Sequence, residues 1–470
     1  MDVTHYENFM DVPRIRGGGL THINSDLLLA TGEGKFYWID LSKDSEKPPV
    51  TELVINFPIN LNDFGEKIGW QPFHIHFKLL DVLAVEQGDG NYNLYVSYHF
   101  WNIEEDCFSI RVSKTDITQD GLLSGKPGSW ELLFETSPCQ ELYETEDIGT
   151  QFQEGIRSGG RMLQLDENHI ILSTGDHGYD GVNAETIVSQ DLNSSLGKTI
   201  KINTDSGASE FYTIGNRNPQ GLFLSKSGII WETEHGPEGG DEINILEESK
   251  NYGWPNATYG TDYGTTEWPL VNIQGKHDGY PRPIYTFVPS IGISNLIEVE
   301  KDLFPFWKGD LLVGSLVGNL LHRVRVEEGR VIFAEPIELG HRLRDIIEIQ
   351  DGRIVMWTDE GTLITLEPSE SAYNFPPSFV ACTACHTTYE NGPERIGPNL
   401  WGIIGKQIAS STEFKYSNAF SEQLGYWNRE SLNQLLESPI DFAPGTLMVT
   451  PGIIDPGKRD EIITFLESLN

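Results

Sequence analysis

The stretch from Gly215 to Asn244 gathers residue types that could bind an anion and a hard cation together. It reads GNRNPQGLFLSKSGIIWETEHGPEGGDEIN, with Arg217 among several amides and a Gly236-Pro237 turn next to acids. Arginine supplies paired planar donors for carboxylates, and backbone carbonyls suit calcium. The run Ile229–Trp231 is expected to be a strand, with GNRNPQG and EHGPEGGDE as the loops at its two ends.

A second motif, Cys382-Thr-Ala-Cys385-His386, carries different chemistry. Two thiols one helical turn apart can each form a thioether to a haem vinyl group, and the adjacent histidine presents its imidazole to the iron. A zinc site would need further cysteines or clustered histidines nearby, and the sequence has neither. The motif therefore predicts covalent haem c, with Cys382 and Cys385 as attachment points and His386 as an iron ligand.

Residues 1–366 are the part that must position the first stretch. They are dominated by short strands of period two, broken by Gly, Asp and Asn. A unit of turn, strand and Gly- and acid-rich loop recurs at residues 23–41, 166–178, 226–236, 308–326 and 351–366. A two-sheet sandwich is the alternative, but the chain is long for one sandwich and the unit recurs too often. The pattern predicts an all-β propeller.

The pattern changes after residue 366. Residues 367–378 are rich in Pro, Ser and acids and are predicted to be a linker. Apolar residues recur at helical spacing in 427–439 and again in 457–469. Residues 379–470 are therefore predicted to form a small all-α domain.

The formal net charge of −37 at pH 7 makes nucleic acid and anionic membrane surfaces poor partners. No apolar run approaches the length needed to span a membrane. The cysteines outside the haem motif, Cys107 and Cys139, could form a disulfide in an oxidising compartment or stay as buried thiols.

The first residues, MDVTHYENFM, have neither the basic start nor the apolar core of a signal peptide. Covalent c-type haem is attached outside the bacterial cytoplasm. We therefore expect a leader that has been removed or replaced, and a periplasmic or extracellular location.

Three motifs in order, GNRNPQGL, EHGPEGGDEIN and NYGWP (Asn251–Pro255), resemble those of the soluble PQQ-dependent glucose/aldose sugar (sorbosone) dehydrogenases. The resemblance implies a six-bladed β-propeller over residues 1–366 that holds pyrroloquinoline quinone (PQQ) and calcium in its central funnel. Residues 379–470 resemble a class I cytochrome c. There GPNLWGIIGK (397–406) matches the loop beside the haem, and PGTLM (444–448) matches the loop that supplies a sixth ligand, here Met448.

The resemblance also assigns roles in the funnel. Arg217 and Asn218 match the pair that contacts the quinone, and HRLRDII (341–347) matches a segment with two arginines, here Arg342 and Arg344. Gly236 and Pro237 match the turn whose carbonyl oxygens hold calcium. Alternatives remain for the arginines, since a buried arginine often ties loops to carbonyls and a basic pair is often solvated.

The sequence departs from the family where the catalytic base is expected. In the family the base is a histidine in a pattern like HxGGR, whereas this chain reads RSGGR, with Arg157 in that position. A guanidinium stays protonated and cannot accept a proton. Asp176, in LSTGDHG, matches the aspartate that orients the base. The neighbouring His177, or His235, could serve as the base instead, although a lone histidine in a turn is more often structural.

Two further family features are missing. The lysine expected near GSLVGN is replaced by Val317 or Gly318, and the family's QGGL segment has only a faint counterpart in FGEKIGW (64–70).

Together these observations predict a quinohaemoprotein oxidoreductase. It would oxidise a sugar or related alcohol or aldehyde with PQQ and calcium, and pass electrons through haem c to an external acceptor such as a cytochrome or oxidase. The alternative is an electron-transfer or ligand-binding protein whose propeller lacks dehydrogenase activity because Arg157 replaces the base.

Overall fold

The computed structural model describes residues 1–41, 47–68, 77–141, 144–145, 151–152, 156–368, 375–390, 392–448 and 450–469. The chain forms two compact units, Asp2–Glu367 and Pro368–Asn470. Half of the predicted linker, residues 369–374, lies outside the described residues.

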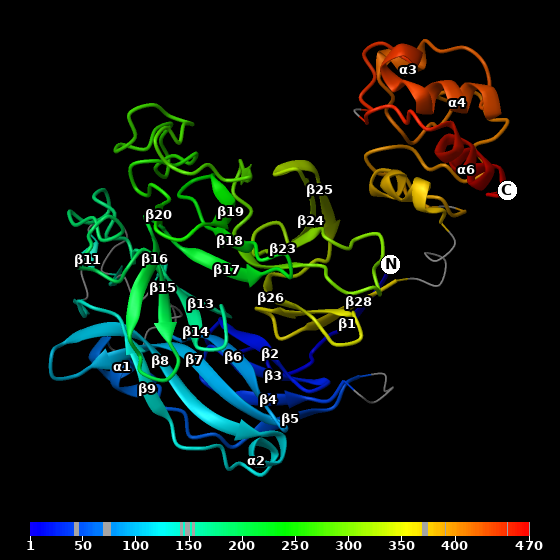
Figure 1. Ribbon diagram of the computed structural model, residues 1–470. Helices are drawn as coiled ribbons and strands as arrows, with labels where there is room; N and C mark the ends of the chain where they lie inside the picture. Colours follow the sequence, from blue (N-terminus) through cyan, green and yellow to red (C-terminus); the bar gives the residue numbers. More distant parts are fainter. Residues whose placement is uncertain are drawn as a thin grey trace. The chain divides into compact units, whose positions relative to one another are not determined.

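Six sheets of four or five strands make up the first unit (Figure 1). Pairing is antiparallel throughout, apart from a short parallel pairing of β20 with β16. The sheets comprise β2 (Gly18–Ile23), β3 (Asp26–Thr31), β4 (Phe36–Ile39) and β5 (Val50–Leu53); β6 (Leu79–Gly88), β7 (Asn91–Asn102), β8 (Cys107–Thr118), β9 (Glu131–Glu135) and β10 (Gln140–Glu141); β13 (Gly159–Gln164), β14 (His169–Thr174), β15 (Lys198–Asn203), β16 (Ser209–Ile214) and β20 (Lys250–Asn251); β17 (Pro219–Leu224), β18 (Ile230–Glu234), β19 (Asp241–Leu246) and β21 (Tyr285–Phe287); β22 (Ile293–Glu298), β23 (Leu311–Ser315), β24 (Leu320–Glu327) and β25 (Arg330–Glu338); and β26 (Leu343–Glu348), β27 (Ile354–Thr358), β28 (Leu363–Glu367) and β1 (Asp2–Tyr6).

Short elements lie outside these sheets. They are a hairpin of β11 (Glu144–Thr145) and β12 (Gln151–Phe152), and two helices, α1 (Leu61–Ile68) and α2 (Gln119–Leu123).

The first strands of the six sheets form a closed ring. β2 contacts β6, β6 contacts β13, and the contacts continue through β17, β22 and β26 back to β2. A cyclic order of six inner strands defines a six-bladed propeller, which confirms the prediction. The N-terminal strand β1 completes the last blade by pairing with β28, from Asp2↔Glu367 to Tyr6↔Leu363 (Figure 1). Both ends of the propeller chain are thereby held in one sheet.

The apolar cores lie between neighbouring blades. Leu28 of the first blade packs with Val82 of the second in one cluster, and Leu27 packs with Trp357 of the last blade in another. Corresponding clusters fill the other four interfaces. Burying an aliphatic side chain of this kind contributes about 1.5–3 kcal/mol. Each sheet is therefore buried on both faces, which explains why a strand such as β3 is buried at every position.

Cys107, at the start of β8, forms a disulfide with Cys139, which precedes β10. The structure thus decides between the two alternatives that the sequence left open. A disulfide is typical of a protein that matures in an oxidising compartment.

The second unit contains a 3₁₀ helix, η3 (Pro377–Ala384), and the α-helices α3 (Asn418–Ser421), α4 (Arg429–Glu437), α5 (Pro439–Phe442) and α6 (Pro456–Glu467). α4 and α6 lie where helical periodicity predicted helices. Asn428 caps α4 by accepting from two backbone N–H groups, and α4 buries Leu432, Leu435 and Leu436 on one face. α6 packs against both α4 and η3.

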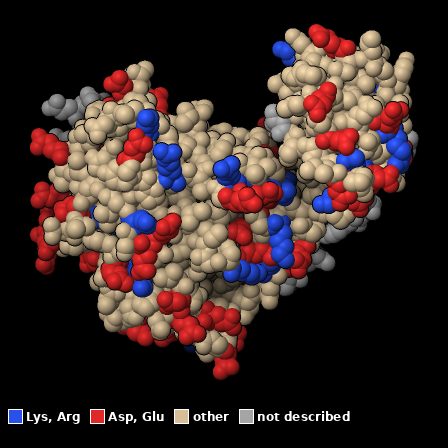
Figure 2. All heavy atoms as spheres, turned by 45° about the horizontal axis from the view of Figure 1, so that its top comes forward, with Lys and Arg blue, Asp and Glu red and all other residues tan. Residues whose placement is uncertain are grey.

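The net charge of the protein and the lengths of its helices limit what its surface can bind. On the face drawn in Figure 2, Asp and Glu are spread widely among smaller groups of Lys and Arg, in keeping with the net charge of −37. Among the described residues, none of the helices has the length and apolar character that crossing a bilayer requires.

Candidate active site

The predicted funnel residues, far apart in sequence, gather at one end of the propeller. Arg157, Arg217 and Arg342 stand just before the inner strands β13, β17 and β26. Asp176 and Gly236 stand just after the second strands β14 and β18, which run antiparallel to the inner ones. The start of an inner strand and the end of its neighbour meet at the same edge, so all these residues lie at one face of the ring. We call this face the mouth.

One expectation about the Gly215–Asn244 stretch is wrong. GNRNPQG is not wholly a loop, because β17 begins at Pro219, and two strands rather than one separate the motifs. The end of EHGPEGGDE likewise belongs to a strand, since β19 begins at Asp241. The hairpin of β17 and β18 is what returns the chain to the mouth and brings Arg217 beside His235.

Arg157 is held in an ion pair. Its Nη1 donates to Asp180 Oδ2 at 2.8 Å, and the Asp180 carboxylate is fully buried. Asp180 also accepts from the backbone N–H groups of Val182 and Asn183. The guanidinium in the family's base position therefore has a structural partner in this chain.

Asp176 holds the segment that contains Arg217 against the third blade. Its carboxylate accepts from Trp254 Nε1 at 2.7 Å and from the Gly178 N–H at 2.8 Å, and its own N–H donates to the Arg217 carbonyl. Burial raises the pKa of Asp176, and Arg157 opposes that rise. Asp176 thus orients Trp254 and Arg217 by direct hydrogen bonds.

His177 lies in an aromatic environment. Its ring is fully buried, 5.1 Å from the Phe108 ring and 5.9 Å from the His99 ring between centroids. Burial lowers the pKa of His177 to about 3. His177 lines neither of the two hollows described below. This placement gives it the character of a packed core histidine.

Arg217 is a buried cation that does not use all of its hydrogen-bond donors within the described part of the chain. It is 4% exposed, its guanidinium lies 5.1 Å from the Trp254 ring centroid, and Nη1 donates to the His235 carbonyl at 3.0 Å. Within the described part of the chain, its Nε has no hydrogen-bond partner. Burial lowers the pKa of Arg217 to about 10, and Arg157 adds to the effect. An orphaned buried donor on a cation fits an anionic ligand.

Arg217 lines one of the hollows at the mouth, here called the side hollow. Its other lining residues are Gly215, Glu234, His235, Gly236, Gly240, Glu242, Tyr252, Trp254, Ala257, Thr258 and His277. Burial lowers the pKa of His235 to about 4, so this histidine is neutral at pH 7. Asn218, next to Arg217, accepts from the Gly159 N–H and from Gln220 Nε2 and so ties the third blade to the fourth.

The turn at Gly236 and Pro237 is fixed by Asp241. The Gly236 N–H donates to Asp241 Oδ1 at 3.0 Å, and the same carboxylate accepts from the N–H groups of Ile291 and Ile293. Among the described residues, neither the Gly236 nor the Pro237 carbonyl accepts a hydrogen bond. Two carbonyls left open on a rigid turn are suitable calcium ligands.

Arg342 and Arg344 share one carboxylate. Asp359 Oδ1 and Oδ2 accept from Arg344 Nε and Nη2 at 2.8 and 2.9 Å, and Arg342 Nε donates to Oδ2 at 3.1 Å. Burial alone would raise the pKa of Asp359, but the two arginines bring it below its usual value. Two cations against one anion leave a net positive charge at this side of the mouth.

The second hollow lies on the propeller axis and is here called the axial hollow. It is lined by Gly17, Lys78, Leu80, Ser158, Gly159, Arg161, Gln220 and Arg344. The residues come from five different blades, so no local sequence pattern marks them. Lys78, Asp180 and Asp359 are the site residues that sequence reasoning missed.

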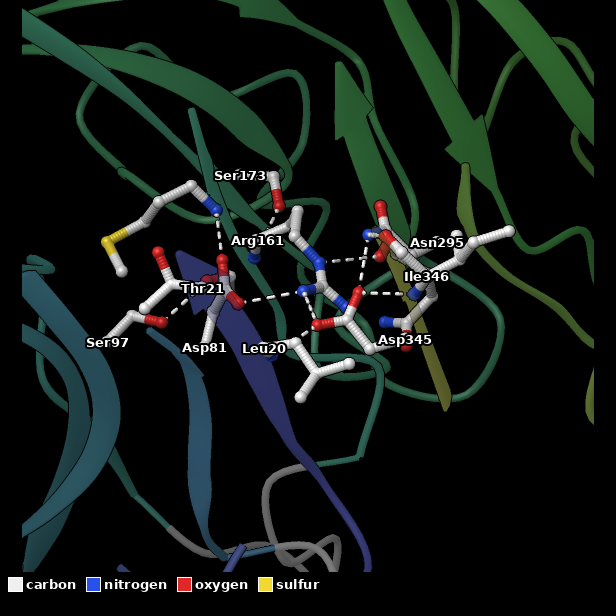
Figure 3. A network of polar contacts seen from close by, with 12 residues as sticks. Leu20, Thr21, Asp81, Ser97, Arg161, Ser173, Asn295, Asp345 and Ile346 are labelled. Atoms are coloured by element: carbon white, nitrogen blue, oxygen red, sulfur yellow. Dashed lines mark hydrogen bonds and ion pairs between the residues drawn. The ribbon is translucent and has the colours of Figure 1, made fainter. Parts of the chain in front are cut away.

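A buried charge network surrounds Arg161, which lines the axial hollow (Figure 3). Arg161 Nη1 donates to Asp81 Oδ1 at 2.7 Å and to Asp345 Oδ2 at 3.1 Å, and Asn295 Nδ2 donates to Asp345 Oδ1. Gly19 permits this packing, because a Cβ there would lie 2.5 Å from Asp81 Oδ1. These residues stand on inner strands of five blades and lock the blades together across the axis.

Two further sequence predictions concern the position of the missing lysine and the counterpart of the QGGL segment. Val317 is 59% exposed, and Gly318 has a φ of +89°. The end of the FGEKIGW segment, residues 69 and 70, lies outside the described residues, and its beginning belongs to α1.

The haem motif occupies the end of η3 in the second unit. Cys382 lies within η3, and Cys385 is the C-cap residue of that helix. His386 Nδ1 lies 2.6 Å from the Pro398 carbonyl, which therefore accepts from it and directs Nε2 outward. Gly397 permits the approach, since a Cβ there would lie 2.3 Å from His386 Cε1. Burial lowers the pKa of His386, which favours the neutral form that binds iron.

Met448 packs on the same apolar cluster as Cys382. The cluster also includes Phe379, Leu400 and Trp401. Two thiols, an oriented imidazole and a thioether around one apolar cluster are the donor set and the surroundings that haem c requires. The residues present therefore fit the group.

The geometry up to this point defines a six-bladed propeller with a cationic mouth, followed by a small helical unit with a haem-attachment motif. Residues 78–365 match the family model for glucose/sorbosone dehydrogenase. The chain therefore belongs to the glucose/sorbosone dehydrogenase family.

Individual relatives divide along the same boundary. The chain is 30% identical to the aldose sugar dehydrogenase YliI of Escherichia coli over 287 residues, which cover 55% of this chain and 73% of that protein. It is 31% identical over 259 residues to slr1608 of Synechocystis, covering 51% of this chain and 60% of that protein. A cytochrome c homolog of Rickettsia typhi is 41% identical over 87 residues, 18% of this chain and 50% of that protein.

Solved structures share the propeller fold. A glucose dehydrogenase superposes with a TM-score of 0.63 at 23% identity, covering 78% of this chain and all of that one. The PQQ-bound aldose sugar dehydrogenase of Streptomyces coelicolor has a TM-score of 0.55 at 17% identity, covering 78% of this chain and 98% of that one.

Proposed function

We propose that this protein is a quinohaemoprotein dehydrogenase. It oxidises a sugar or a related alcohol or aldehyde with PQQ and calcium bound at the mouth, and electrons leave through haem c on the second unit. The observation that carries the proposal is that the orphaned Arg217 donor and Gly236 line one hollow, and that the Gly236–Pro237 turn carries two carbonyls that accept no hydrogen bond among the described residues. A site of this kind is built for a polyanion and a hard cation side by side.

The mouth residues have distinct roles in this function. Arg217, Arg342 and Arg344 supply guanidinium groups for the carboxylates of PQQ, with Asn218 as an amide neighbour. Gly236 and Pro237 supply carbonyl oxygens for calcium. Bound there, calcium-polarised PQQ would supply the hydride-accepting chemistry that oxidation of a hydroxyl-bearing carbon requires.

The second unit receives the electrons in this proposal. Cys382 and Cys385 would hold the haem covalently, and His386 and Met448 would supply the ligands of its iron. Ligation by His and Met raises the reduction potential of haem iron, which favours electron transfer from a reduced quinone. An external cytochrome or oxidase is the expected final acceptor.

The proposed location is the periplasm or the extracellular space. The Cys107–Cys139 disulfide supports this, because such bonds persist in oxidising compartments. Binding to nucleic acid is not expected, given the net charge of −37.

An optical experiment tests the function. The haem-containing protein is loaded with PQQ and calcium under exclusion of oxygen, and haem absorption is followed as a panel of sugars is added. Haem reduction that requires both PQQ and a sugar supports the proposal. The control omits PQQ, and dithionite then verifies that the haem can be reduced.

A second function is favoured by the Arg157–Asp180 ion pair, which fills the family's base position with a permanent cation. In that case the propeller binds PQQ or another ligand without oxidising a sugar, and the protein serves in electron transfer or ligand binding. PQQ binding with no substrate-dependent haem reduction would support this alternative. Arg157→His then tests whether that position alone accounts for the loss.

A further inference from the structure

The mouth needs a proton acceptor that the family's pattern does not supply here. Oxidation of a hydroxyl group releases a hydride from carbon and a proton from oxygen. Arg157 stays protonated in its pair with Asp180, and His177 is buried against Phe108. Among the described lining residues of the axial hollow, Lys78, Arg161 and Arg344 are the titratable side chains. Of these three, lysine is the one that can lose its proton near neutral pH.

Lys78 stands in the axial hollow next to the segment that carries the family's base. It directly precedes the inner strand β6, and it lines the hollow together with Ser158 and Gly159, which follow Arg157. Its aliphatic chain runs against Gly17, where a Cβ would lie 2.8 Å from Lys78 Cδ. Lys78 thus belongs to a different blade from Arg157, and only the fold brings the two segments to the same hollow.

The Lys78 amine has no fixed partner. Within the described residues, its Nζ forms no hydrogen bond and no ion pair, whereas Arg161 and Arg344 are both bound by aspartates. Lys78 is therefore the one basic side chain of the described hollow lining that is left available to a ligand. A fully protonated amine would normally attract such a carboxylate partner.

Charged groups on several of the described elements lie around this amine. Arg344 on β26 and Arg161 on β13 are cationic, and Asp359 after β27 is anionic but is occupied by Arg342 and Arg344. His99 on β7 lies with Nδ1 3.1 Å from the Lys78 backbone nitrogen. Burial lowers the pKa of Lys78 to about 7, with Arg344 adding to the shift and Asp359 opposing it.

We propose that Lys78 is the general base of this enzyme and takes over the role of the family's histidine. The inference rests on the proposed function. In the reaction, the neutral amine at Nζ accepts the proton of the substrate hydroxyl while a hydride leaves the adjacent carbon for the quinone. The products are a carbonyl compound, a quinone reduced by two electrons and an ammonium group, which then releases its proton to water.

A different role for Lys78 would be a permanent cation that anchors a carboxylate. The two roles make opposite demands on the residue, because an anchor must stay protonated and a base must not. Arginine could replace an anchor but never a base. This difference decides the design of the experiment.

The first measurement is independent of activity. The protein is labelled with ¹³C-lysine, and the Lys78 Cε resonance, assigned by its loss in Lys78→Met, is titrated by NMR. We expect a midpoint near pH 7, well below the value of about 10.4 for an unperturbed lysine. A Lys78 midpoint near pH 10 would overturn the proposal.

The second measurement uses sugar-dependent haem reduction in the intact protein. Lys78→Met and Lys78→Arg are both expected to lower kcat about 10²- to 10⁴-fold, the usual contribution of a general base. PQQ affinity, measured separately by titration, should change little in Lys78→Arg. Adding Arg157→His to Lys78→Met should restore activity by returning a base to the family's position.

The outcomes distinguish a failure of the Lys78 proposal from a failure of the proposed function. Full activity in Lys78→Arg would overturn the base and support a carboxylate anchor. A wild-type protein that binds PQQ but oxidises no sugar would overturn the proposed function and the base with it. Loss of activity with a Lys78 midpoint near pH 10 would overturn the base alone.

Discussion

The haem-attachment site and the propeller mouth are assembled in opposite ways. Cys382, Cys385 and His386 lie within five consecutive residues, and the Pro398 carbonyl that orients the histidine is 12 residues away. At the mouth, the Arg161–Asp345 ion pair joins residues 184 positions apart, and Leu20 donates to Asp345 across 325. The residues of the haem-attachment site form a local sequence motif, whereas those of the mouth come together only when the ring of blades closes.

Burial acts in the same way at the two sites, but only the mouth must also keep charged side chains. At the mouth, burial lowers the pKa of the cations Lys78 and Arg217. At the haem site, it raises the pKa of the Cys382 thiol to about 12. In both cases burial favours the neutral form. The mouth, however, must still hold several cations for its proposed ligand, and it does so with Asp180, Asp345 and Asp359.

The largest expected effect is a complete loss of covalent haem that leaves the propeller site unaffected. Replacing Cys382 and Cys385 together by Ser should abolish covalent haem, because no thioether can form. Denaturing chromatography followed by mass measurement checks this. The propeller should still oxidise sugar with an artificial dye as acceptor, since its site is built from other residues. Cys107→Ser with Cys139→Ser is the matched control and should keep the haem. Covalent haem in the Cys382/Cys385 variant would contradict the assignment.

Arg161→Met should weaken the propeller but not the haem unit. It leaves Asp81 and Asp345 buried without their cation, which should lower the free energy of unfolding by about 3–5 kcal/mol. Urea unfolding followed by near-UV dichroism for the propeller and by haem absorption for the second unit measures both. Arg353→Met, which breaks a more exposed pair with Asp351, should cost about 1 kcal/mol or less. Equal losses in the two variants would show that the network does not hold the blades.

Arg217→Met should weaken ligand binding without weakening the fold. Charge-assisted hydrogen bonds contribute about 1.5–3 kcal/mol, so PQQ affinity should fall about 10- to 150-fold. The free energy of unfolding should fall little, since the buried guanidinium has an unfilled donor. Fluorescence titration with PQQ measures the affinity, and Lys226→Met on the surface is the control. Unchanged affinity would remove Arg217 from the proposed site.

The last expected effect concerns the pH dependence of stability. The pKa of Lys78 is about 7 in the folded protein and 10.5 when unperturbed. The unfolded chain therefore binds more protons between these values, and Lys78 makes stability increase as pH rises from 7 to 10.5. Below pH 7 this contribution is lost. The difference in unfolding free energy between wild type and Lys78→Met should accordingly change across that window. A difference that is constant with pH would mean that Lys78 titrates normally.

Much of the architecture could be predicted from the sequence. Recurring period-two strands indicated a propeller, and β3, β14, β18, β23 and β27 lie in the predicted units. The helical spacing of apolar residues located α4 and α6. The strand β17 was misjudged, because Pro219 and Gly221 in GNRNPQG look like turn residues. Proline is tolerated there because it is the first residue of its strand, and Gly221 lies at a bulge.

The candidate site was predictable in part. The family motifs named Arg217, Asn218, Gly236, Pro237, Arg342 and Arg344, and the structure brings these to one face of the ring. Asp180, the partner of Arg157, and Asp359, the partner of Arg342 and Arg344, were not predicted, since a single aspartate in a loop carries no signal. Lys78 had none either, because a lysine in front of an apolar strand is usually a solvated end.

The sequence by itself determined the strand and helix patterns, the haem motif and the family motifs of the mouth. These depend on residues close together in the chain, whose spacing fixes which side chains share a face or a turn. The tertiary structure alone decided the Cys107–Cys139 bond, the Arg161 network and the place of Lys78 on the axis. Those depend on which blades become neighbours when the ring closes, and on the loss of water there, which changes how strongly each charge is held.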